Sequence, residues 1–244
     1  MTTKELYNYL NERIPAELSE DWDNDGRMLI SSDREIKRVL ISLDVTGETV
    51  SKAVKESFDL IITHHPLIFK PVKGITDERF LTLIKADISV FSFHTRLDAV
   101  EGGVNDALAS LLGLKNTEAF EEMGRIGELD KEMTAEEFAH FVKNTLGAPL
   151  VNFTDSEKKI KRAALLGGGG KDFWQAASAE ADAYVTGEMS HNTLLDAHEQ
   201  GFCVVEAGHY FTEFPVCRVL EAMVKDLDPG IETEIFDFYP VKSI

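Results

Sequence analysis

The stretch "IKRVLISLD" at residues 36–44 is a short run of β-branched and apolar residues that ends on an aspartate. A similar stretch, "IKRAALLGG", occupies residues 160–168. An apolar–threonine step follows the isoleucine of each stretch at nearly equal spacing, 27 and 26 residues further on, in "IITHH" and "YVTGE". Short apolar runs of this kind are typical of buried strands in a parallel sheet. The two stretches therefore predict an α/β unit that occurs twice in the chain.

The rest of the chain alternates predicted strands with amphipathic helices, which is the pattern of an α/β protein. The further predicted strands span residues 59–64, 88–94, 183–188, 202–208 and about 231–238. Predicted helices of the second half lie near residues 171–181, 190–200 and 212–226. We expect a two-lobed α/β subunit built from a duplicated α/β unit, with mixed sheets flanked by helices. Its halves are expected at residues 1–125 and 126–244, with the site formed between them.

Two further helices carry clear end signals. Thr2 with Glu5, and Thr134 with Glu137, have the spacing of a capping box, in which a threonine and a glutamate satisfy each other's backbone amides. Gly147 follows the second of these helices and is the residue expected to end it. We therefore predict one helix at the start of the chain and one in its middle.

The composition of the 244-residue chain is that of a globular protein with a strong negative charge. Hydrophobic residues make up 43% and charged residues 28%, enough for one large core or two modest ones. The formal net charge of −18 disfavours a nonspecific grip on phosphate backbones, so nucleic acid is not expected as a partner. The densest acidic stretch, residues 119–138, is interpreted as a solvated face.

The chain shows no signal for membrane insertion or export. No run approaches the roughly 20 apolar residues of a membrane span. The start, "MTTKELYNYLNERIP", is charged and amphipathic, unlike a basic, apolar export signal. We therefore expect a cytoplasmic protein with no membrane partner. Cys203 and Cys217 are too few for a disulfide framework or a thiolate zinc site, and we interpret them as buried thiols.

Several histidines stand where predicted strands end, namely His64, His65, His94 and His209. In open α/β sheets, ligands collect at the carboxyl ends of the strands. Asp98 and Glu213 follow the last two of these histidines at the same spacing, H-x3-D and H-x3-E. Imidazole nitrogens and carboxylate oxygens suit divalent zinc, iron, manganese, nickel or cobalt better than calcium. The set is large enough for two ions about 3.5–4 Å apart that share a bridging ligand.

Other motifs allow both a structural and a functional interpretation. The loop "LLGGGGKDFW" lacks the spacing of a phosphate-binding loop, so a tight strand-to-helix turn is favoured, with Lys171 as the contact if nucleotide phosphate does bind there. His191 opens a predicted helix directly after "TGEMS" and is a candidate pocket residue. His140 and His198 are expected on the surface. Trp22 is either a core anchor or a wall of the metal pocket.

Five segments, in this order, resemble a known family: "DWDNDGR", "DLIITHHPLIF", "FHTRLDAVEGGVND", "TGE" and "AGHYFTE". The chain is similar, nearly end to end, to the dinuclear-metal-centre hexameric proteins often called GTP cyclohydrolase I type 2. The combination of the HHP and GHxxxE elements carries the resemblance. It implies two-lobed α/β subunits assembled into a toroidal homohexamer, with two divalent metal ions inside each subunit.

The resemblance also implies roles for individual residues. The metal ligands that it assigns are His64, His65, Asp98, His209 and Glu213. Glu213 is the best candidate to bridge the two ions. His94 is expected either behind the ligands or facing the substrate, and an alternative role for it is to orient Asp98 through a hydrogen bond.

Three residues depart from the family pattern. The family tends to have an apolar residue where this chain has Asp25 and Arg27, and an asparagine where it has Arg96. A cation beside the site either favours an anionic substrate or pairs with one of the carboxylates.

The chemistry that such a metal pair performs by default is hydrolysis with metal-bound hydroxide. We therefore expect a metal-dependent hydrolase acting on a small, nucleotide-like substrate, with His94 or His191 as the catalytic proton carrier. No G-x-S-x-G elbow competes for that role. The family name points to GTP cyclohydrolase activity. The alternative is a non-catalytic metal-binding or scaffold protein that handles iron or docks a partner, so the ligands alone leave open whether the chain is an enzyme.

Overall fold

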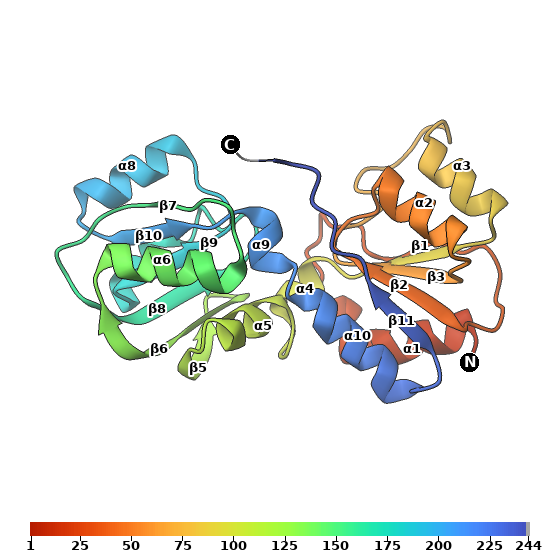
Figure 1. The fold of residues 1–244 in the computed structure, drawn as a ribbon, viewed down its shortest axis with the longest axis horizontal. Coiled ribbons are helices and arrows are strands. Elements are labelled where there is room, and N and C mark those ends of the chain that lie inside the picture. The colour runs from red at the N-terminus through yellow and green to blue at the C-terminus, as the bar shows by residue number, and fades with distance from the viewer. Residues whose placement is uncertain (243–244) are drawn as a thin grey trace. The chain divides into compact units, whose positions relative to one another are not determined.

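The computed structural model describes residues 1–242, which form two compact units (Figure 1). Unit 1 comprises Met1–Val100 and Val216–Pro240. Unit 2 comprises Glu101–Pro215, together with Val241 and Lys242. Both units are therefore discontinuous in sequence, because the chain returns to unit 1 at Val216 and leaves it again after Pro240.

The sheet of unit 1 has five strands in the order β1-β4-β3-β2-β11. In chain order, β1, β2, β3, β4 and β11 span Gly26–Leu29, Arg38–Ser42, Leu60–Thr63, Ser89–Ser92 and Glu232–Ile235. The last four are mutually parallel, whereas β1 pairs antiparallel with β4. The carboxyl ends of β2, β3 and β4 therefore meet at one edge of the sheet.

Helices cover both faces of this sheet (Figure 1). The first face carries α2 and α3, which span Gly47–Lys55 and Glu78–Lys85. The second face carries α1 and α10, which span Thr3–Arg13 and Val216–Leu227, and the short helices η1 and α4 span Ala16–Leu18 and Thr95–Ala99. Leu40, Ile61 and Val90 of the central strands belong to the core beneath α2 and α3. Because side chains alternate along a strand, their neighbours point to the other face.

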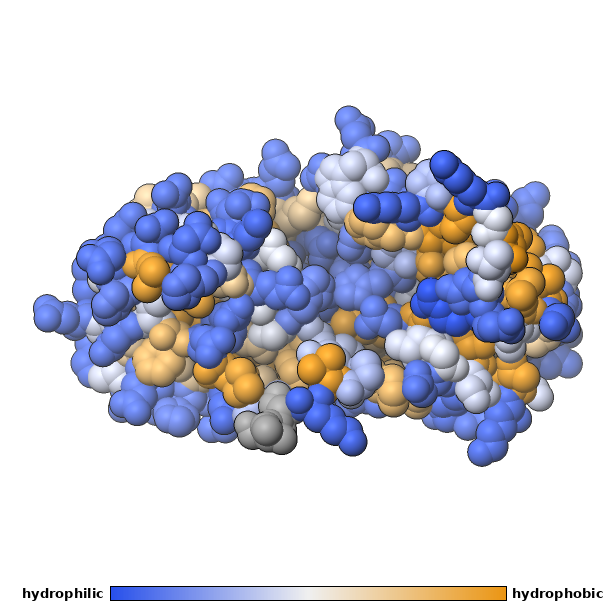
Figure 2. Space-filling view, turned by 90° about the horizontal axis from the view of Figure 1, so that it is seen from above, coloured by the Kyte–Doolittle hydropathy of each residue, from blue (hydrophilic) through white to orange (hydrophobic). Residues whose placement is uncertain are grey.

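The α2–α3 face of unit 1 also keeps apolar side chains at its outer surface (Figure 2). Val54 of α2 and Ile84 of α3 are 39% and 45% exposed. Residues of both helices line a groove of about 550 Å³.

The sheet of unit 2 has six strands in the order β5-β6-β8-β9-β10-β7. In chain order, β5 to β10 span Lys115–Phe120, Gly124–Met133, Asn152–Phe153, Ile160–Leu166, Ala183–Thr186 and Cys203–Glu206. β8, β9 and β10 are parallel, and the remaining pairings are antiparallel. The carboxyl ends of the three parallel strands again lie at one edge.

Two helical layers enclose this second sheet. In chain order, α5 to α9 span Val104–Leu111, Ala135–Leu146, Trp174–Glu180, His191–Glu199 and His209–Glu213. Leu165 and Val185 pack in one core with residues of α5 and α6, whereas Ala164 and Tyr184 pack in the other core with residues of α7 and α8. This alternation is what the period-two pattern of a strand buried on both faces produces.

The two sheets repeat one arrangement. In unit 1 the order β2-β3-β4 continues into the antiparallel strand β1, and in unit 2 the order β8-β9-β10 continues into the antiparallel strand β7. The sequence stretches at 36–44 and 160–168 supply the corresponding strands β2 and β8. The mixed α/β class with helix-flanked sheets is thus confirmed. The compact units are divided at different residues from the sequence halves 1–125 and 126–244, which follow the repeat.

The predicted strands and capped helices are present. Thr2 and Thr134 close capping boxes with Glu5 and Glu137, and Gly147 ends α6 in the left-handed conformation with φ of 66°. The single helix predicted near 212–226 is instead two, α9 and α10. Proline lacks the amide hydrogen that a helix interior needs, and Pro215 lies between them.

The sequence patterns missed strand β1 and the hairpin of β5 and β6. The hairpin falls largely in the acidic stretch 119–138, where Glu121, Glu122 and Asp130 are exposed as the solvated-face interpretation expected. Ile126 and Leu129 of β6 are nevertheless buried. β6 is buried through pairing with β8, a partner that local periodicity does not reveal.

Within residues 1–242, no helix combines the length and apolar character required to cross a bilayer. Both cysteines are free and buried, as expected. Burial raises the pKa of the Cys203 thiol to about 12, and burial likewise raises the pKa of Cys217 far above its ordinary value.

Candidate metal centre

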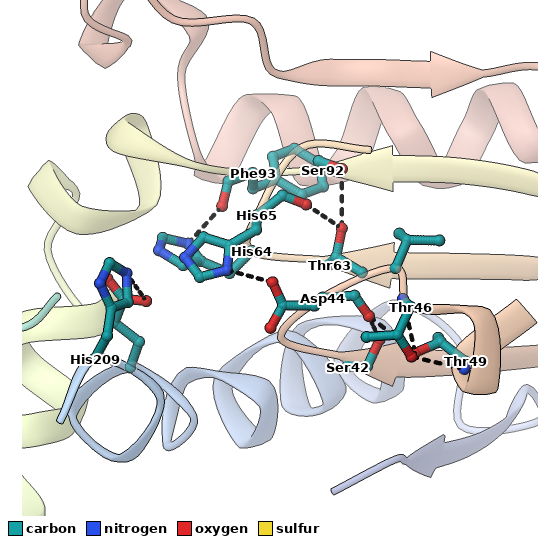
Figure 3. Close-up of polar contacts among 12 residues, drawn as sticks. Ser42, Asp44, Thr46, Thr49, Thr63, His64, His65, Ser92, Phe93 and His209 are labelled. Atoms are coloured by element: carbon teal, nitrogen blue, oxygen red, sulfur yellow. Dashed lines mark hydrogen bonds and ion pairs between the residues drawn. The ribbon is translucent and has the colours of Figure 1, made fainter. Parts of the chain in front are cut away.

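The histidines of unit 1 lie at the carboxyl ends of two neighbouring parallel strands. β3 ends at Thr63 and leads directly into His64 and His65, and β4 ends shortly before His94. The Thr63 hydroxyl donates to the carbonyl oxygen of His65 at 2.8 Å and lies 2.9 Å from the Ser92 hydroxyl (Figure 3). These bonds tie the two strand ends together and hold the turn that carries both imidazoles.

His64 is completely buried, and a backbone partner sets its tautomer. Its Nδ1 lies 2.9 Å from the carbonyl oxygen of Phe93 (Figure 3). A carbonyl only accepts hydrogen bonds, so Nδ1 donates and Nε2 presents a lone pair in the neutral ring. This Nε2 lies 3.7 Å from Oδ1 of Asp98. A lone pair and a carboxylate oxygen so close repel each other unless a cation or a further proton lies near both.

His65 and His94 are oriented by carboxylates. Nδ1 of His65 lies 2.8 Å from Oδ1 of Asp44 (Figure 3), and Nδ1 of His94 lies 2.9 Å from Oδ1 of Asp23. Metal-binding histidines almost always donate their second ring N–H to a carboxylate or carbonyl in this way, which directs the other nitrogen at the ion. All three imidazoles of the cluster therefore have the support that a ligand needs.

The three rings also face one another. Their centroids lie 4.9 Å apart for His64 and His65, 5.3 Å for His64 and His94, and 5.7 Å for His65 and His94. One ring nitrogen from each residue lies within 4.8 Å of the other two. Bonds of about 2.0–2.1 Å from one zinc-like ion place two nitrogens at most about 4.2 Å apart. Small side-chain movements would thus bring the three nitrogens to one ion, so this cluster fits a metal.

Asp23 fixes the position of His94 in this cluster. Its side chain is completely buried and accepts hydrogen bonds from His94 and from the amide and hydroxyl of Thr95. Burial alone would raise the pKa of Asp23, but these hydrogen bonds and the charge of His94 outweigh it and hold that pKa well below its ordinary value. Asp23 therefore stays ionised and fixes His94.

Unit 2 holds a second group of candidate ligands at the end of β10. α9 is one turn long and begins at His209, so His209 and Glu213 lie on the same side of it. Nε2 of His209 lies 3.0 Å from Oε2 of Glu213, and its Nδ1 lies 3.2 Å from Oε1 of Glu188. Glu213 is nearly buried, with 5% of its side chain exposed, whereas 36% of the His209 side chain is exposed. The pair offers one nitrogen and one carboxylate to a cation.

Glycines make room for this pair. A Cβ on Gly168, whose φ is +64°, would lie 2.0 Å from Oε1 of Glu213 and 3.2 Å from Nε2 of His209. A Cβ on Gly187 would lie 2.7 Å from the Cα of His209. Side chains larger than glycine at these positions would displace the candidate ligands. The glycine-rich loop between β8 and α7 is therefore a strand-to-helix turn that also shapes the site.

The other singled-out residues have different surroundings. His140, His191, His198 and Lys171 are exposed. His191 is the first residue of α8, so its expected role as a proton carrier remains a prediction. Trp22 is 61% exposed and its ring lies 6.1 Å from that of His94, so the core-anchor interpretation was wrong.

Of the two alternatives for the cation of Arg96, an anionic substrate or a carboxylate partner, the structure shows the carboxylate partner. Arg96 is 1% exposed, and its Nε lies 2.9 Å from the carboxylate of Asp25. Two of the three departures from the family pattern, Arg96 and Asp25, thus pair with each other. Arg27, the third departure, lies with its guanidinium 5.2 Å from the ring centre of Tyr7.

Three orienting carboxylates were not predicted as site residues, namely Asp23, Asp44 and Glu188. Each stood in a quoted segment, "DWDNDGR", "IKRVLISLD" or "TGE". A strand-end position was the available signal for Asp44. Asp23 had no such signal, because it pairs with a residue 71 positions away.

Comparison with known proteins agrees with this fold and with the resemblance noted in the sequence. A protein of Clostridium perfringens named GTP cyclohydrolase 1 type 2 homolog is 33% identical over 95% of each chain. A protein of Methanocaldococcus jannaschii with the same name is 32% identical over 93% of this chain and 97% of its own. The crystal structure of a Staphylococcus aureus hypothetical protein superposes with a TM-score of 0.91 at 30% identity, covering 100% of this chain and 99% of that one.

The family model described as DUF34/NIF3 (NGG1p interacting factor 3) matches residues 1–240, nearly the whole chain. The protein therefore belongs to the DUF34/NIF3 family.

Proposed function

We propose that the protein is a metal-dependent hydrolase in which the two ligand groups hold a pair of divalent ions. The ligands are His64, His65 and Asp98 from unit 1, with His209 and Glu213 from unit 2. The observation that carries this proposal is that His64 and His65 are each held at Nδ1 by an oxygen acceptor, in a cluster with His94 where one nitrogen of each ring lies within 4.8 Å of the others. His64 and His65 act as ligands in this proposal, and His94 lies close enough to them to exchange protons with a bound substrate. Zinc, iron, manganese, nickel and cobalt suit this donor set.

When bound, divalent ions would acidify water and polarise a carbonyl, imine or phosphoryl group of the substrate. The chain's own residues do the orienting work. Asp44 and the Phe93 carbonyl keep the protons of His65 and His64 on Nδ1. His94, held at Nδ1 by Asp23, can accept a proton at Nε2 and return it to a leaving group, which makes it a better-placed proton carrier than the exposed His191.

The relatives named GTP cyclohydrolase 1 type 2 homolog suggest a nucleotide-like substrate. Opening of a heteroaromatic ring and hydrolysis of a phosphoester both use the same polarisation and water activation. A screen of purified, metal-loaded protein against GTP, other nucleotides, phosphoesters and cyclic amides tests this activity. Metal-dependent turnover is expected for at least one class, and absence of turnover above the metal-free protein across the screen contradicts the hydrolase assignment.

Metal analysis tests the centre itself. We expect two divalent ions per chain by inductively coupled plasma mass spectrometry. His64→Ala should lose metal, whereas His140→Ala, which changes an exposed histidine, should retain it.

The same analysis tests whether the two ligand groups act together. If they share the ions, Glu213→Gln and His64→Ala each leave fewer than one ion per chain. If each variant instead retains one full ion, the groups are separate sites and the paired centre is refuted.

A non-catalytic metal-binding or scaffold role is the second candidate, because His64 and Glu213 are almost fully buried, as ligands of a saturated structural ion are. This role predicts bound metal that has no exchangeable water. Water-proton relaxation measurements on the manganese-loaded protein report whether water exchanges at the ion.

We further propose assembly into a toroidal homohexamer in the cytoplasm. Light scattering should then give a mass about six times the 27.2 kDa of one chain.

A further inference from the structure

Two large aromatic side chains of unit 1 are exposed next to each other. Trp22 is 61% exposed and Phe69 is 50% exposed. Their ring centroids lie 5.9 Å apart with an interplanar angle of 49°, so the two rings are in contact and inclined. Aromatic rings of this size are usually buried in a globular chain, so an exposed contacting pair calls for a partner.

Both rings also contact the imidazole of His94. The centroid of His94 lies 6.1 Å from that of Trp22 and 6.0 Å from that of Phe69, at angles of 79° and 74°. The ring of His94 thus packs nearly perpendicular to both aromatic rings, while one of its nitrogens belongs to the histidine cluster. The aromatic pair therefore borders the site where the substrate's reacting group would lie.

The residues next to Trp22 and Phe69 in the chain are held by hydrogen bonds. The side chain of Asp23, adjacent to Trp22, is completely buried and hydrogen-bonded to His94 and Thr95. The side-chain amide of Asn24 donates to the carbonyl of Ile68, the residue before Phe69. This hydrogen bond joins the two loops, and the buried hydrogen bonds of the Asp23 side chain fix the residue next to Trp22, so the exposed rings are held in place.

From this arrangement we propose that Trp22 and Phe69 bind the planar heteroaromatic ring of the substrate by stacking, with the reacting group directed to the histidine cluster. The inference rests on the proposed function, and it specifies which part of the substrate the protein binds. A flat ring suits this surface because the faces of both aromatics accept any π-system without hydrogen-bond readout. Lys70 and Lys73 follow Phe69 in the same exposed loop and favour an anionic substituent on that ring in a chain of net charge −18.

Fluorescence offers a direct test, since the chain has only two tryptophans. Trp174 is buried in α7, so the variant Trp174→Phe leaves Trp22 as the single emitter. Guanosine 5′-monophosphate should quench this emission saturably, and ribose 5-phosphate, which lacks the flat ring, should leave it unchanged. Equal quenching by both compounds, or by neither, overturns the proposal.

Equilibrium dialysis of guanosine 5′-monophosphate supplies a second measurement that does not depend on Trp174→Phe. Trp22→Leu and Phe69→Leu should each weaken binding about ten-fold, the magnitude of losing one base–aromatic stack. Phe153→Leu changes a phenylalanine of similar exposure, 40%, on the edge strand β7, and it should bind as the unchanged protein does. Unaltered affinity in both Trp22→Leu and Phe69→Leu overturns the proposal.

Two controls separate this inference from its alternatives. Trp22→Leu should retain its bound metal, and Trp22 quenching should persist in metal-free protein, so failure of the metal proposal and failure of stacking give different results. If Trp22→Leu instead lowers the mass measured by light scattering and leaves nucleotide affinity unchanged, the aromatic pair is a contact between copies of the chain and the stacking subsite is refuted.

Discussion

Arg96 and Asp25 form an ion pair in which Nε lies 2.9 Å from the carboxylate and both side chains are almost fully buried, at 1% and 7% exposure. Arg96 also donates to the carbonyl oxygen of Ile14 and to the side chain of Asn11 at 3.0 and 2.8 Å. The guanidinium thus joins α4 to the end of α1, close to the loop that carries Asp23.

This pair predicts a strong asymmetry between single and double substitution. Arg96→Met or Asp25→Val alone should lower the free energy of unfolding by about 3–5 kcal/mol, because each leaves an unpaired buried charge. The double variant should lose less than the sum of the two. Urea unfolding of all four proteins gives the coupling free energy. As a control, Arg162→Met breaks an ion pair with Glu118 whose side chains are 33% and 70% exposed, and it should cost at most about 1 kcal/mol. Additive effects of the two single variants would contradict the pairing.

The carboxylate of Asp44, which pairs with Nδ1 of His65, predicts an effect on metal binding without loss of a ligand. Asp44→Asn should weaken metal affinity about 10- to 100-fold, since a neutral amide oxygen is a weaker acceptor than the carboxylate for the N–H of His65 and orients that imidazole less firmly. Competition with a chelator measures this change. Asp130→Asn, which neutralises an exposed carboxylate of β6, is the matched control and should leave affinity unchanged. Wild-type affinity in Asp44→Asn would mean that His65 is not a ligand.

The close packing around Gly168 predicts that an added side chain there also reduces metal binding. Gly168→Ala places a Cβ 2.0 Å from Oε1 of Glu213 and should displace that carboxylate and reduce bound metal. Gly147→Ala is a close control, because φ is +66° there and a Cβ meets nothing within 4 Å. Both variants carry the left-handed backbone strain of about 1–2 kcal/mol. Only Gly168→Ala should lose metal as well, as measured by mass spectrometry.

The two buried cysteines predict a pH dependence of thiol reactivity. Because burial raises the pKa of Cys203 to about 12 and raises that of Cys217 as well, neither thiol ionises appreciably in the folded chain near pH 9. Iodoacetamide should therefore label the native protein negligibly and the urea-unfolded protein fully.

The same shifts determine the sign of a stability effect. The unfolded thiols ionise near pH 8.5. Their contribution to stability is fully present below that pH and declines as the pH rises towards the raised pKa values of the folded thiols, about 12 for Cys203. Rapid native labelling near pH 8.5 would show that the thiols are accessible.

Much of the fold could be predicted because its signals are local. The runs at 36–44 and 160–168 became β2 and β8, and Thr134 and Gly147 bound α6, since caps and periodicity involve residues close in sequence. The hairpin of β5 and β6 escaped prediction. Its burial comes from pairing with β8, a segment about 30 residues further along the chain from β6.

The sequence by itself determined which side chains stand at the strand ends, since an apolar run followed by His64 and His65, or by His94, places imidazoles at the carboxyl edge of a parallel sheet. Only the tertiary structure decided the state of those rings. Asp44 is 21 residues from His65 and Asp23 is 71 residues from His94. A hydrogen bond of 2.8 or 2.9 Å depends on where the folded chain brings its partners, so the orienting carboxylates became evident only in three dimensions.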